Sequence, residues 1–328
     1  MKKRQAVVGV DLGGTSLFAA VMNPKNGNIL GEAKTKTRAS EGAIRVLERM
    51  ARVVDKAIKR SNVPRKAIRG VGVGVPGPVD PASGVVVRLT NLGPTWDGFP
   101  LRERYSQLLN LRVTVDNDVN VGAVGEHTFG AGRGTNDMLA IFIGTGIGGG
   151  IILNGQLRSG WRNSAGEVGH MSIMDGGPIC GCGEHGHAEA LASRTAIDRR
   201  IREQIAEGHA SVVTELLEKR GRDDISSSII GAAFDSGDVV VLNAVREAQH
   251  YLGLLIGSCV NLLDPEAVVV GGGVLERMGD EYLKPVRVVA QQHYINKVDK
   301  RSVRIVPATL GDYSGAMGAA ELAHRRLA

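Results

Sequence analysis

Two stretches of the chain repeat the same order of apolar and glycine-rich positions. The apolar run Ala6–Val10 leads into Asp11–Thr15, and apolar residues resume over Ser16–Met22. The apolar run Met138–Ile143 leads in the same way into Gly144–Gly150, after which a short apolar run follows. Apolar runs of this length on both sides of a glycine-rich turn predict two β-hairpins.

The rest of the chain alternates between helical and strand patterns. Apolar residues recur every three to four positions over residues 41–60, which predicts a helix. Further helices are predicted at 120–129, 239–263 and 314–327, and short apolar runs predict strands at 69–75, 112–115 and 267–270. Because a repeated unit can determine a whole architecture, the two hairpin units predict a duplicated α/β fold.

Length and composition agree with a fold of two lobes. The chain has 328 residues, of which 43% are apolar and 23% are charged, as is typical of a globular protein with two cores. We expect a smaller α/β lobe over residues 1–120 and a larger α/β lobe over residues 121–313. The C-terminal helix, in residues 314–328, is expected to pack back on the first lobe.

Charge and cysteine content exclude several classes of protein. The net charge is +6, but the basic residues alternate with acidic ones and lack interleaved aromatic residues, which argues against a nucleic-acid partner. The apolar run after the basic start Met1–Arg4 stops at Asp11, too early for a signal peptide, and residues 138–153 are too broken by glycine to span a membrane. Three cysteines make no disulfide framework. We therefore expect a cytoplasmic protein with no membrane partner.

The glycine turns suggest phosphate binding. Glycine has no Cβ, so backbone N–H groups in such turns can approach phosphate oxygens, and a threonine hydroxyl can add a donor. An aspartate at the end of the strand can hold Mg²⁺. A third glycine turn, Gly271–Gly273, follows the predicted strand 267–270. One such turn is as compatible with a plain hairpin, but two in equivalent places and a third after a strand favour a nucleotide site.

A cluster of polar residues follows another predicted strand. Asp116, Asn117 and Asp118 come directly after residues 112–115. Such a position suits a carboxylate that accepts the proton of a sugar hydroxyl during phosphoryl transfer. Aspartate and asparagine are also common in turns and at helix N-caps, so this motif alone favours a structural role.

Four side chains with affinity for zinc lie close together in the sequence. Cys180, Cys182 and two histidines fall within 180–187, and His170 precedes them. Two thiolates and two imidazoles suit a closed tetrahedral zinc site, and the intervening glycines allow so short a loop to fold around a metal ion. Because all four ligands would come from the protein, we expect a structural rather than a catalytic ion.

Together these motifs resemble the ROK family (repressors, open reading frames, kinases), and the resemblance covers nearly the whole chain. It implies the duplicated two-lobe fold of sugar kinases and actin-like ATPases (ribonuclease H-like), with a zinc-binding loop. The resemblance implies Asp118 as catalytic base, and it implies that Asn117, Asp118, Glu167, His170 and Glu189 bind the sugar. His170, Cys180 and Cys182 match the family's zinc ligands, and His187 stands where the fourth ligand is usually cysteine, with His185 as the alternative. The implied nucleotide-binding residues are Asp11, Gly13, Gly14, Thr15, Gly144, Thr145, Gly146, Gly148, Gly271, Gly272 and Gly273.

The resemblance also implies a reaction. We expect ATP-dependent phosphorylation of a hexose of the glucokinase or hexokinase type, with ATP, Mg²⁺ and structural Zn²⁺, in a homo-oligomer that is a dimer or tetramer. Mannose, fructose, an N-acetylhexosamine and polyphosphate as donor stay open as alternatives. A DNA-binding repressor is disfavoured because only ten residues precede Asp11. The segment 91–96 resembles a stretch that borders the sugar, although a structured loop with a partly buried Trp96 fits equally.

Overall fold

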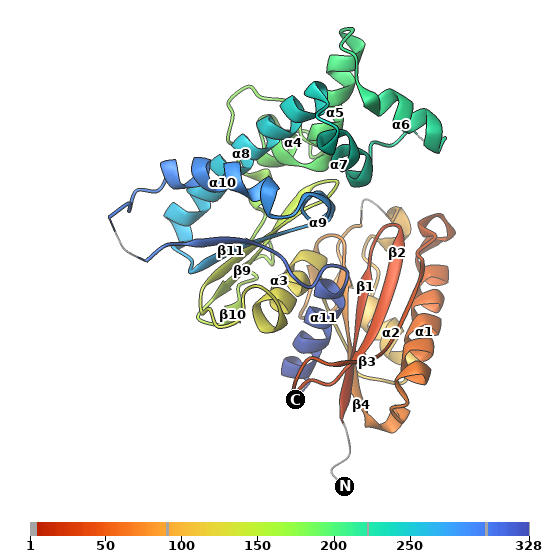
Figure 1. The fold of residues 1–328 in the computed structure, drawn as a ribbon. Helices are drawn as coiled ribbons and strands as arrows, with labels where there is room; N and C mark the ends of the chain where they lie inside the picture. Colours follow the sequence, from red (N-terminus) through yellow and green to blue (C-terminus); the bar gives the residue numbers. More distant parts are fainter. Residues whose placement is uncertain (1–4, 90–91, 222, 299–300, 328) are drawn as a thin grey trace. The chain divides into compact units, whose positions relative to one another are not determined.

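The computed structural model describes residues 5–89, 92–221, 223–298 and 301–327, and the chain folds into two compact units (Figure 1). Unit 1 comprises residues 1–136, 150–165 and 312–328, and unit 2 comprises residues 137–149 and 166–311. We expected the first lobe to end near residue 120. The chain instead stays in unit 1 as far as Asn136, because the helix that begins at Asp118 packs against the C-terminal helix of the same unit.

Unit 1 is built on a five-stranded sheet in the order β3-β2-β1-β4-β7. β1 pairs antiparallel with β2 and parallel with β4, which in turn pairs parallel with β7. The strands are β1 (Ala6–Leu12), β2 (Ser16–Met22), β3 (Ile29–Lys36), β4 (Ile68–Val75) and β7 (Val113–Asn117), and a separate small hairpin joins β5 (Val79–Asp80) to β6 (Val85–Val86). The predicted first hairpin and the strands at 69–75 and 112–115 are therefore present.

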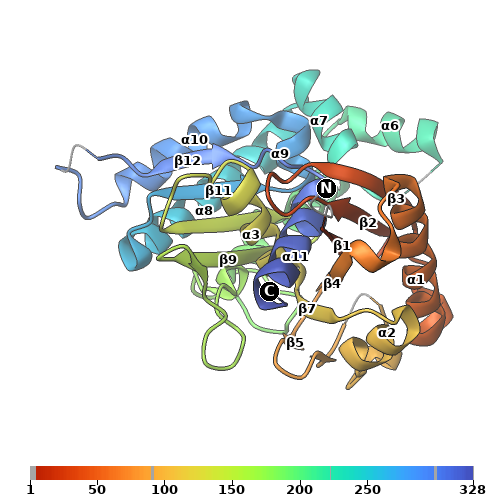
Figure 2. The same cartoon turned by 90° about the horizontal axis from the view of Figure 1, so that it is seen from below.

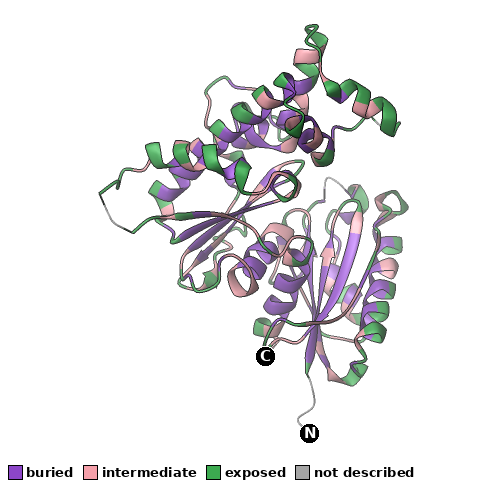
Figure 3. Ribbon diagram, in the orientation of Figure 1, coloured by how far each residue is buried: buried purple, intermediate pink, exposed green. Residues whose placement is uncertain are grey.

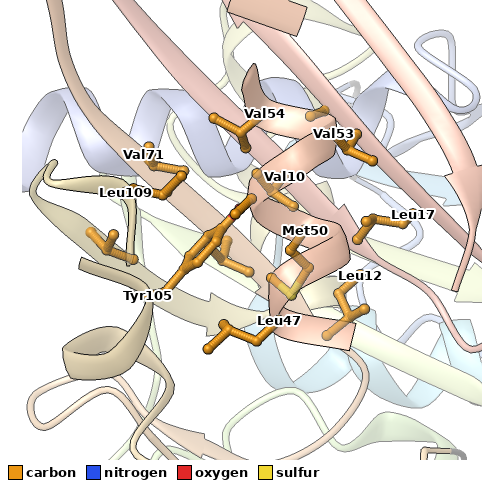
Figure 4. Packing of buried hydrophobic residues seen from close by; sticks show 14 of the residues in the cluster. Val10, Leu12, Leu17, Leu47, Met50, Val53, Val54, Val71, Tyr105 and Leu109 are labelled. Atoms are coloured by element: carbon orange, nitrogen blue, oxygen red, sulfur yellow. The ribbon is translucent and has the colours of Figure 1, made fainter. Parts of the chain in front are cut away.

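Helices cover both faces of this sheet, as Figures 1 and 2 show. One face packs against α1 (Gly42–Ser61) and α2 (Leu101–Leu109). Side chains of α1 such as Met50 and Val54 meet Val10, Leu12 and other buried residues of the strands there (Figure 4). The other face packs against α3 (Asp118–Phe129) and the C-terminal helix α11 (Tyr313–Arg326).

Glycine allows α11 to lie unusually close to its neighbours. A Cβ on Gly9 of β1 would lie 1.7 Å from the carbonyl oxygen of Ala316, and a Cβ on Gly318 of α11 would lie 1.6 Å from that of Val121. No real Cβ tolerates such a distance, so a substitution at Gly9 would push α11 away from the sheet, and one at Gly318 would push it away from α3. Part of the high glycine content therefore serves packing rather than ligand binding.

The second sheet has the order β10-β9-β8-β11-β12, which repeats the order of the first sheet. Its strands are β8 (Met138–Ile143), β9 (Ile147–Leu153), β10 (Gln156–Leu157), β11 (Ala267–Gly271) and β12 (Arg304–Pro307). β11 pairs parallel with both β8 and β12. The matching strand orders confirm the predicted duplication.

Helices make up most of unit 2. They are α4 (Ala188–Ala192), α5 (Arg194–Ala206), α6 (Val212–Arg220), α7 (Ser227–Asp235), α8 (Val239–Leu263), α9 (Gly273–Met278) and α10 (Asp280–Gln292). α8 spans the predicted residues, is largely buried (Figure 3), and packs against α4, α5 and α10. Short 3₁₀ helices lie at Ala39–Glu41, Arg65–Ala67, Pro94–Trp96 and Val168–His170.

Both glycine turns are shorter than the sequence suggested. β1 continues to Leu12, so that the first turn contains only Gly13, Gly14 and Thr15. β9 begins at Ile147, so that Gly148, Gly149 and Gly150 belong to a strand. The strands extend further because glycine has the same backbone N–H and C=O groups as other non-proline residues. The hydrogen bonds between strands outweigh the weak strand propensity of glycine.

No single helix in the described part of the chain is long and apolar enough to cross a membrane. By length and composition alone, α7 and α8 would pass as a pair, bent by 115°.

Candidate functional site

The first glycine turn is held by backbone bonds and by one buried threonine. The N–H of Gly13 donates to the carbonyl oxygen of Ser16 at 2.9 Å. Thr37, whose side chain is inaccessible to solvent, donates its hydroxyl to the Gly13 carbonyl oxygen at 2.6 Å and its N–H to that of Thr15 at 2.9 Å. Gly14 and Thr15 remain exposed, so the tip of the turn is accessible to a ligand.

Asp11 places a carboxylate beside this turn, near the end of β1. Its side chain packs under α11, where a Cβ on Gly315 would lie 2.9 Å from the Asp11 carboxyl carbon. Burial, and to a lesser degree the charge of Asp312, raises the pKa of Asp11 to about 6, whereas Lys34 lowers it. Lys34 pairs instead with Asp312 at 2.6 Å. A carboxylate buried in this way gains from a cation ligand, as a Mg²⁺ site requires.

The Asp-Asn-Asp motif occupies the end of β7 and the start of α3. Asn117 is the N-cap of α3, and its side-chain oxygen accepts from the N–H groups of Val119 and Asn120 at 2.9 and 3.1 Å. Asp118 is the first residue of the helix and accepts from the Val119 N–H at 2.9 Å. The structural role that the motif alone favoured is thus present at Asn117, because its acceptor oxygen is used for capping.

Asp116 anchors this motif from behind. Its side chain is almost completely buried and pairs with Arg326 of α11 at 2.5 Å. Its other oxygen accepts from the side chain of Asn120 at 3.0 Å and from the N–H of Asn117 at 2.9 Å. This network fixes the backbone from which Asn117 and Asp118 project.

The second glycine turn is held by side chains of α4 and α5. The N–H of Gly144 donates to Gly146 O at 2.9 Å, and a Cβ on Gly144 would meet no atom within 4 Å, so the turn is open. Thr195 donates its hydroxyl to Thr145 O at 2.7 Å. Glu189 accepts the N–H of Ile147 at 2.9 Å.

The third glycine turn connects β11 to α9. Gly272 has a positive φ of 107°, and a Cβ there would lie 2.1 Å from the carbonyl oxygen of Ile143 at the end of β8. Gly273 begins α9 and faces the hydroxyl oxygen of Ser227, which would lie 3.0 Å from a Cβ on Gly273. Only glycine allows this turn to approach the end of β8, where the second glycine turn begins, so closely.

Four side chains of unit 2 converge as the sequence predicted for a metal site. The ligand atoms of His170, Cys180, Cys182 and His187 all lie within 4.8 Å of one another. His170 Nδ1 lies 3.4 Å from His187 Nδ1 and 3.8 Å from Cys180 Sγ, and Cys182 Sγ lies 3.3 Å from His187 Nδ1. The alternative ligand, His185, instead contacts the carbonyl oxygen of Gly177 at 2.9 Å.

These distances fit zinc. Zinc binds nitrogen and sulfur at about 2.0–2.3 Å, and the ligands of a tetrahedron with those radii are roughly 3.3–3.8 Å apart. The three measured separations fall in that interval. Burial raises the pKa of Cys180 to about 11, so a metal ion must displace the thiol proton to bind there. The cluster is consistent with a closed zinc site.

The predicted sugar ligands of unit 2 lie next to this cluster. His170 turns Nδ1 toward the other metal ligands, which leaves Nε2 for a second partner. Glu167 is exposed and immediately precedes the 3₁₀ helix at Val168–His170. Glu189 lies 3.4 Å from Cys180 Sγ through one carboxylate oxygen, while the other accepts from Ile147. Glu189 therefore connects the metal loop to the second glycine turn, a contact that the sequence did not predict.

The structure describes only part of the segment 91–96, for which both a sugar-bordering role and a structural role were expected. Asn91 lies outside the described residues, whereas Trp96 is completely buried against Phe99, with ring centroids 5.2 Å apart. Trp96 thus belongs to the core of unit 1, which is the structural interpretation of this segment.

Comparison with known proteins assigns the family. The family model described as "ROK family" matches residues 7–326. The chain belongs to the ROK family. It is 35% identical to a glucokinase of Halalkalibacterium halodurans over 313 residues, which cover 95% of this chain and 92% of that protein. It is 31% identical to a xylose repressor of Caldicellulosiruptor bescii, of which it covers 70%.

A solved structure with bound ligands is also similar to this ROK chain. The ROK glucokinase of Streptomyces griseus, in complex with glucose and AMPPNP, superimposes with a TM-score of 0.84 at 34% identity. The similarity covers 98% of this chain and 99% of that one. The fold is thus the two-lobe fold of ROK sugar kinases, and this relative holds both glucose and AMPPNP.

Sequence reasoning missed one charged residue of the ROK chain. Arg194 begins α5, and its guanidinium donates to the hydroxyl oxygen of Thr145 in the second glycine turn at 3.2 Å. The sequence does show a basic residue directly after a serine that could cap a helix. The contact could not be predicted from this, because Arg194 and Thr145 lie far apart along the chain.

Proposed function

We propose that this ROK protein is an ATP-dependent hexose kinase that converts glucose to glucose 6-phosphate. The observation that carries the proposal is the similarity, over nearly the full length of both chains, to a glucokinase whose structure holds glucose and an ATP analogue. Curated relatives with 32–35% identity are glucokinases as well. The exposed Gly14 and Thr15 of the first turn, the open space at Gly144 of the second and the carboxylates of the described residues support the same reaction.

Each residue set has a role in this proposal. ATP supplies the phosphoryl group, and Mg²⁺ bound with it would neutralise the charge on the phosphate oxygens. The three glycine turns bind the nucleotide, and Asp11 holds the cation through its oxygen atoms or through water. Asp118 accepts the proton of the sugar hydroxyl as the phosphoryl group arrives. The hydroxyls of the hexose are bound by Asn117, Asp118, Glu167, His170 and Glu189.

His170, Cys180, Cys182 and His187 hold a structural zinc ion in this proposal. With Nδ1 committed to the metal, the tautomer and orientation of the His170 ring are fixed, and Nε2 is left to hydrogen-bond a sugar hydroxyl. The measured geometry of the four ligand atoms supports this assignment. The zinc ion organises the sugar ligands and takes no part in phosphoryl transfer.

A coupled assay tests the substrate and the donor together. The metal-replete protein is supplied with glucose, mannose, fructose or an N-acetylhexosamine, and with either ATP or polyphosphate. We expect the highest kcat/KM for glucose with ATP, because a site that hydrogen-bonds each hydroxyl rejects epimers that leave buried groups unpaired. A higher kcat/KM for another hexose would replace glucose as the substrate and keep the kinase assignment.

A second candidate is a sugar-responsive regulator without catalysis, which the similarity to the xylose repressor favours. A regulator binds the sugar but forms no sugar phosphate. Calorimetric sugar binding without product, with ATP and Mg²⁺ present and zinc content verified, would contradict the kinase proposal.

A further inference from the structure

Arg194 is a cation at the second glycine turn. It is the first residue of α5, directly after the N-cap Ser193, and its own N–H donates to the Gly144 carbonyl oxygen at 3.1 Å. One guanidinium nitrogen donates to Thr145 Oγ1 at 3.2 Å, and another donates to the Ile225 carbonyl oxygen at 3.2 Å. Backbone and side chain together therefore tie this arginine to the turn.

The charge of Arg194 has no acidic partner in the described part of the chain. The first turn of α5 contains no acidic residue, and Arg194 forms no ion pair with the described residues. The other arginines on the exposed side of α5 do form ion pairs, Arg199 with Glu203 and Arg202 with Asp198. A positive charge at a helix N-terminus is electrostatically unfavourable, because the helix dipole is positive at that end. Such a charge is best accounted for by an anionic ligand.

The bond to Thr145 also determines what the hydroxyl of this threonine can do. A guanidinium only donates hydrogen bonds, so Thr145 Oγ1 must accept from Arg194. The hydroxyl proton is then left to be donated elsewhere, and a hydroxyl oriented in this way suits a phosphate oxygen. Arg194 therefore adds a charged donor and sets the direction of a neutral one.

The second anchor places Arg194 between two parts of the proposed nucleotide site. Ile225, which accepts from Arg194, lies two residues before Ser227, and Ser227 faces Gly273 of the third glycine turn. All these residues belong to unit 2. The guanidinium thus connects the turn at Thr145 to the segment that adjoins the Gly271–Gly273 turn.

We propose that Arg194 binds the phosphate groups of the donor nucleotide, directly and by orienting the Thr145 hydroxyl. This inference rests on the proposed nucleotide site and adds to it a residue that selects for the phosphate chain rather than for the base. Its effect should accordingly depend on how many phosphates the ligand carries, since a structural residue would affect every ligand alike.

The experiment compares adenosine, AMP, ADP and the ATP analogue AMPPNP by calorimetry with the full chain in the presence of Mg²⁺. We expect Arg194→Gln to leave the Kd of adenosine within about twofold, and to raise the Kd of ADP and AMPPNP about ten- to a hundredfold, as loss of a charge-assisted hydrogen bond does. Arg194→Lys keeps the positive charge but lacks the planar set of N–H donors of the guanidinium. It should recover part of the lost affinity for ADP and AMPPNP.

Arg199→Gln is the matched control, because Arg199 lies on the same helix, has the same charge and also donates to a backbone carbonyl oxygen, that of Ala190. It should change none of the four Kd values by more than about twofold, and both variants should keep the wild-type melting temperature. Wild-type Kd values for ADP and AMPPNP in Arg194→Gln, or an equal loss for adenosine, would overturn the inference. If the wild-type protein binds no adenine nucleotide at all, the proposed function fails first and the inference fails with it.

Discussion

The glycine turn after β1 and the glycine turn after β8 occupy the same place in two sheets with the same strand order. Their neighbours differ. Beside the first turn lies the carboxylate of Asp11, and the buried Thr37 holds the backbone. Beside the second turn lies the guanidinium of Arg194, and the exposed Thr195 holds the backbone.

This difference shows that a duplicated backbone need not keep duplicated chemistry. Both turns are proposed to bind the nucleotide through their backbone, but the added charge is negative in unit 1 and positive in unit 2. A carboxylate suits the cation that accompanies a nucleotide, and a guanidinium suits its phosphates. The carboxylate proposed as catalytic base, Asp118, and the proposed metal-binding cluster likewise fall in different units.

Asp118→Asn changes a residue of unit 1 and should have the largest effect on activity. The amide cannot accept the hydroxyl proton, so kcat should fall about 10²–10⁴-fold, while the KM of the hexose changes only a few-fold. Steady-state kinetics with saturating ATP measure both. The variant should keep the secondary structure of the wild type by circular dichroism, and near-normal turnover would show that Asp118 is not the base.

Metal removal should act on unit 2 alone. The loop between His170 and His187 contains two isolated β-bridges and no regular strand or α-helix, so we expect a metal ion bound by the four side chains to contribute to its order. After chelation we expect amide hydrogen exchange in this loop to accelerate at least about tenfold, with no change in the β1–β2 hairpin. Hydrogen exchange followed by mass spectrometry compares the loop with the β1–β2 hairpin, and zinc analysis verifies that the metal ion has been removed.

The same experiment tests the link between metal and sugar. His185→Ala is the control, because His185 contacts Gly177 O and lies outside the cluster, whereas His187→Ala should reproduce the effect of chelation. The KM of the hexose should rise when zinc is lost, since the orientation of His170 is lost with it. Complete removal of zinc with kcat and KM unchanged would contradict the proposed role of the metal.

Part of the fold and of the candidate site could be predicted from the sequence. Apolar runs and glycine turns predicted both hairpins, the long helix α8 and the duplication, because local periodicity determines them. The spacing of His170, Cys180, Cys182 and His187 predicted the cluster, since a short glycine-containing loop can bring such ligands together. The sequence could not predict the contact of Arg194 with Thr145 or the hydrogen bonds of Glu189, because these contacts depend on how α4 and α5 pack against the second glycine turn.

Asp11→Asn should show the cost of the negative charge beside the first turn. The folded-state pKa of Asp11 is raised from 3.8 to about 6, so its stabilising contribution is complete below pH 3.8 and is lost as the pH rises through about 6. The neutral amide avoids that loss. Between pH 7 and 8 we expect the free energy of unfolding of Asp11→Asn to exceed that of the wild type by about 2–3 kcal/mol, with no difference below pH 4.

Urea unfolding of both proteins between pH 4 and pH 8 measures this difference. Asp312→Asn is the comparison, because it removes the second cause of the shift and leaves burial, the first cause, in place. It should lower the pKa of Asp11 only part of the way. A difference between Asp11→Asn and the wild type that does not vary with pH would show that the Asp11 carboxyl titrates normally.

The smallest effect should come from the two threonines that hold the turns, and it compares them directly. Thr37→Val removes the hydroxyl bonded to the Gly13 carbonyl oxygen at a position with no solvent exposure, whereas Thr195→Val removes the exposed hydroxyl bonded to the Thr145 carbonyl oxygen. Beside the completely buried Thr37, an acceptor left without a partner costs about 1–3 kcal/mol, while water replaces the donor at the exposed site and the cost there is about 0.5 kcal/mol. Valine matches threonine in shape, so the difference in the free energy of unfolding between the two variants isolates the hydrogen bonds. Equal losses would mean that the second turn is as rigid as the first, and that the two turns differ in charge alone.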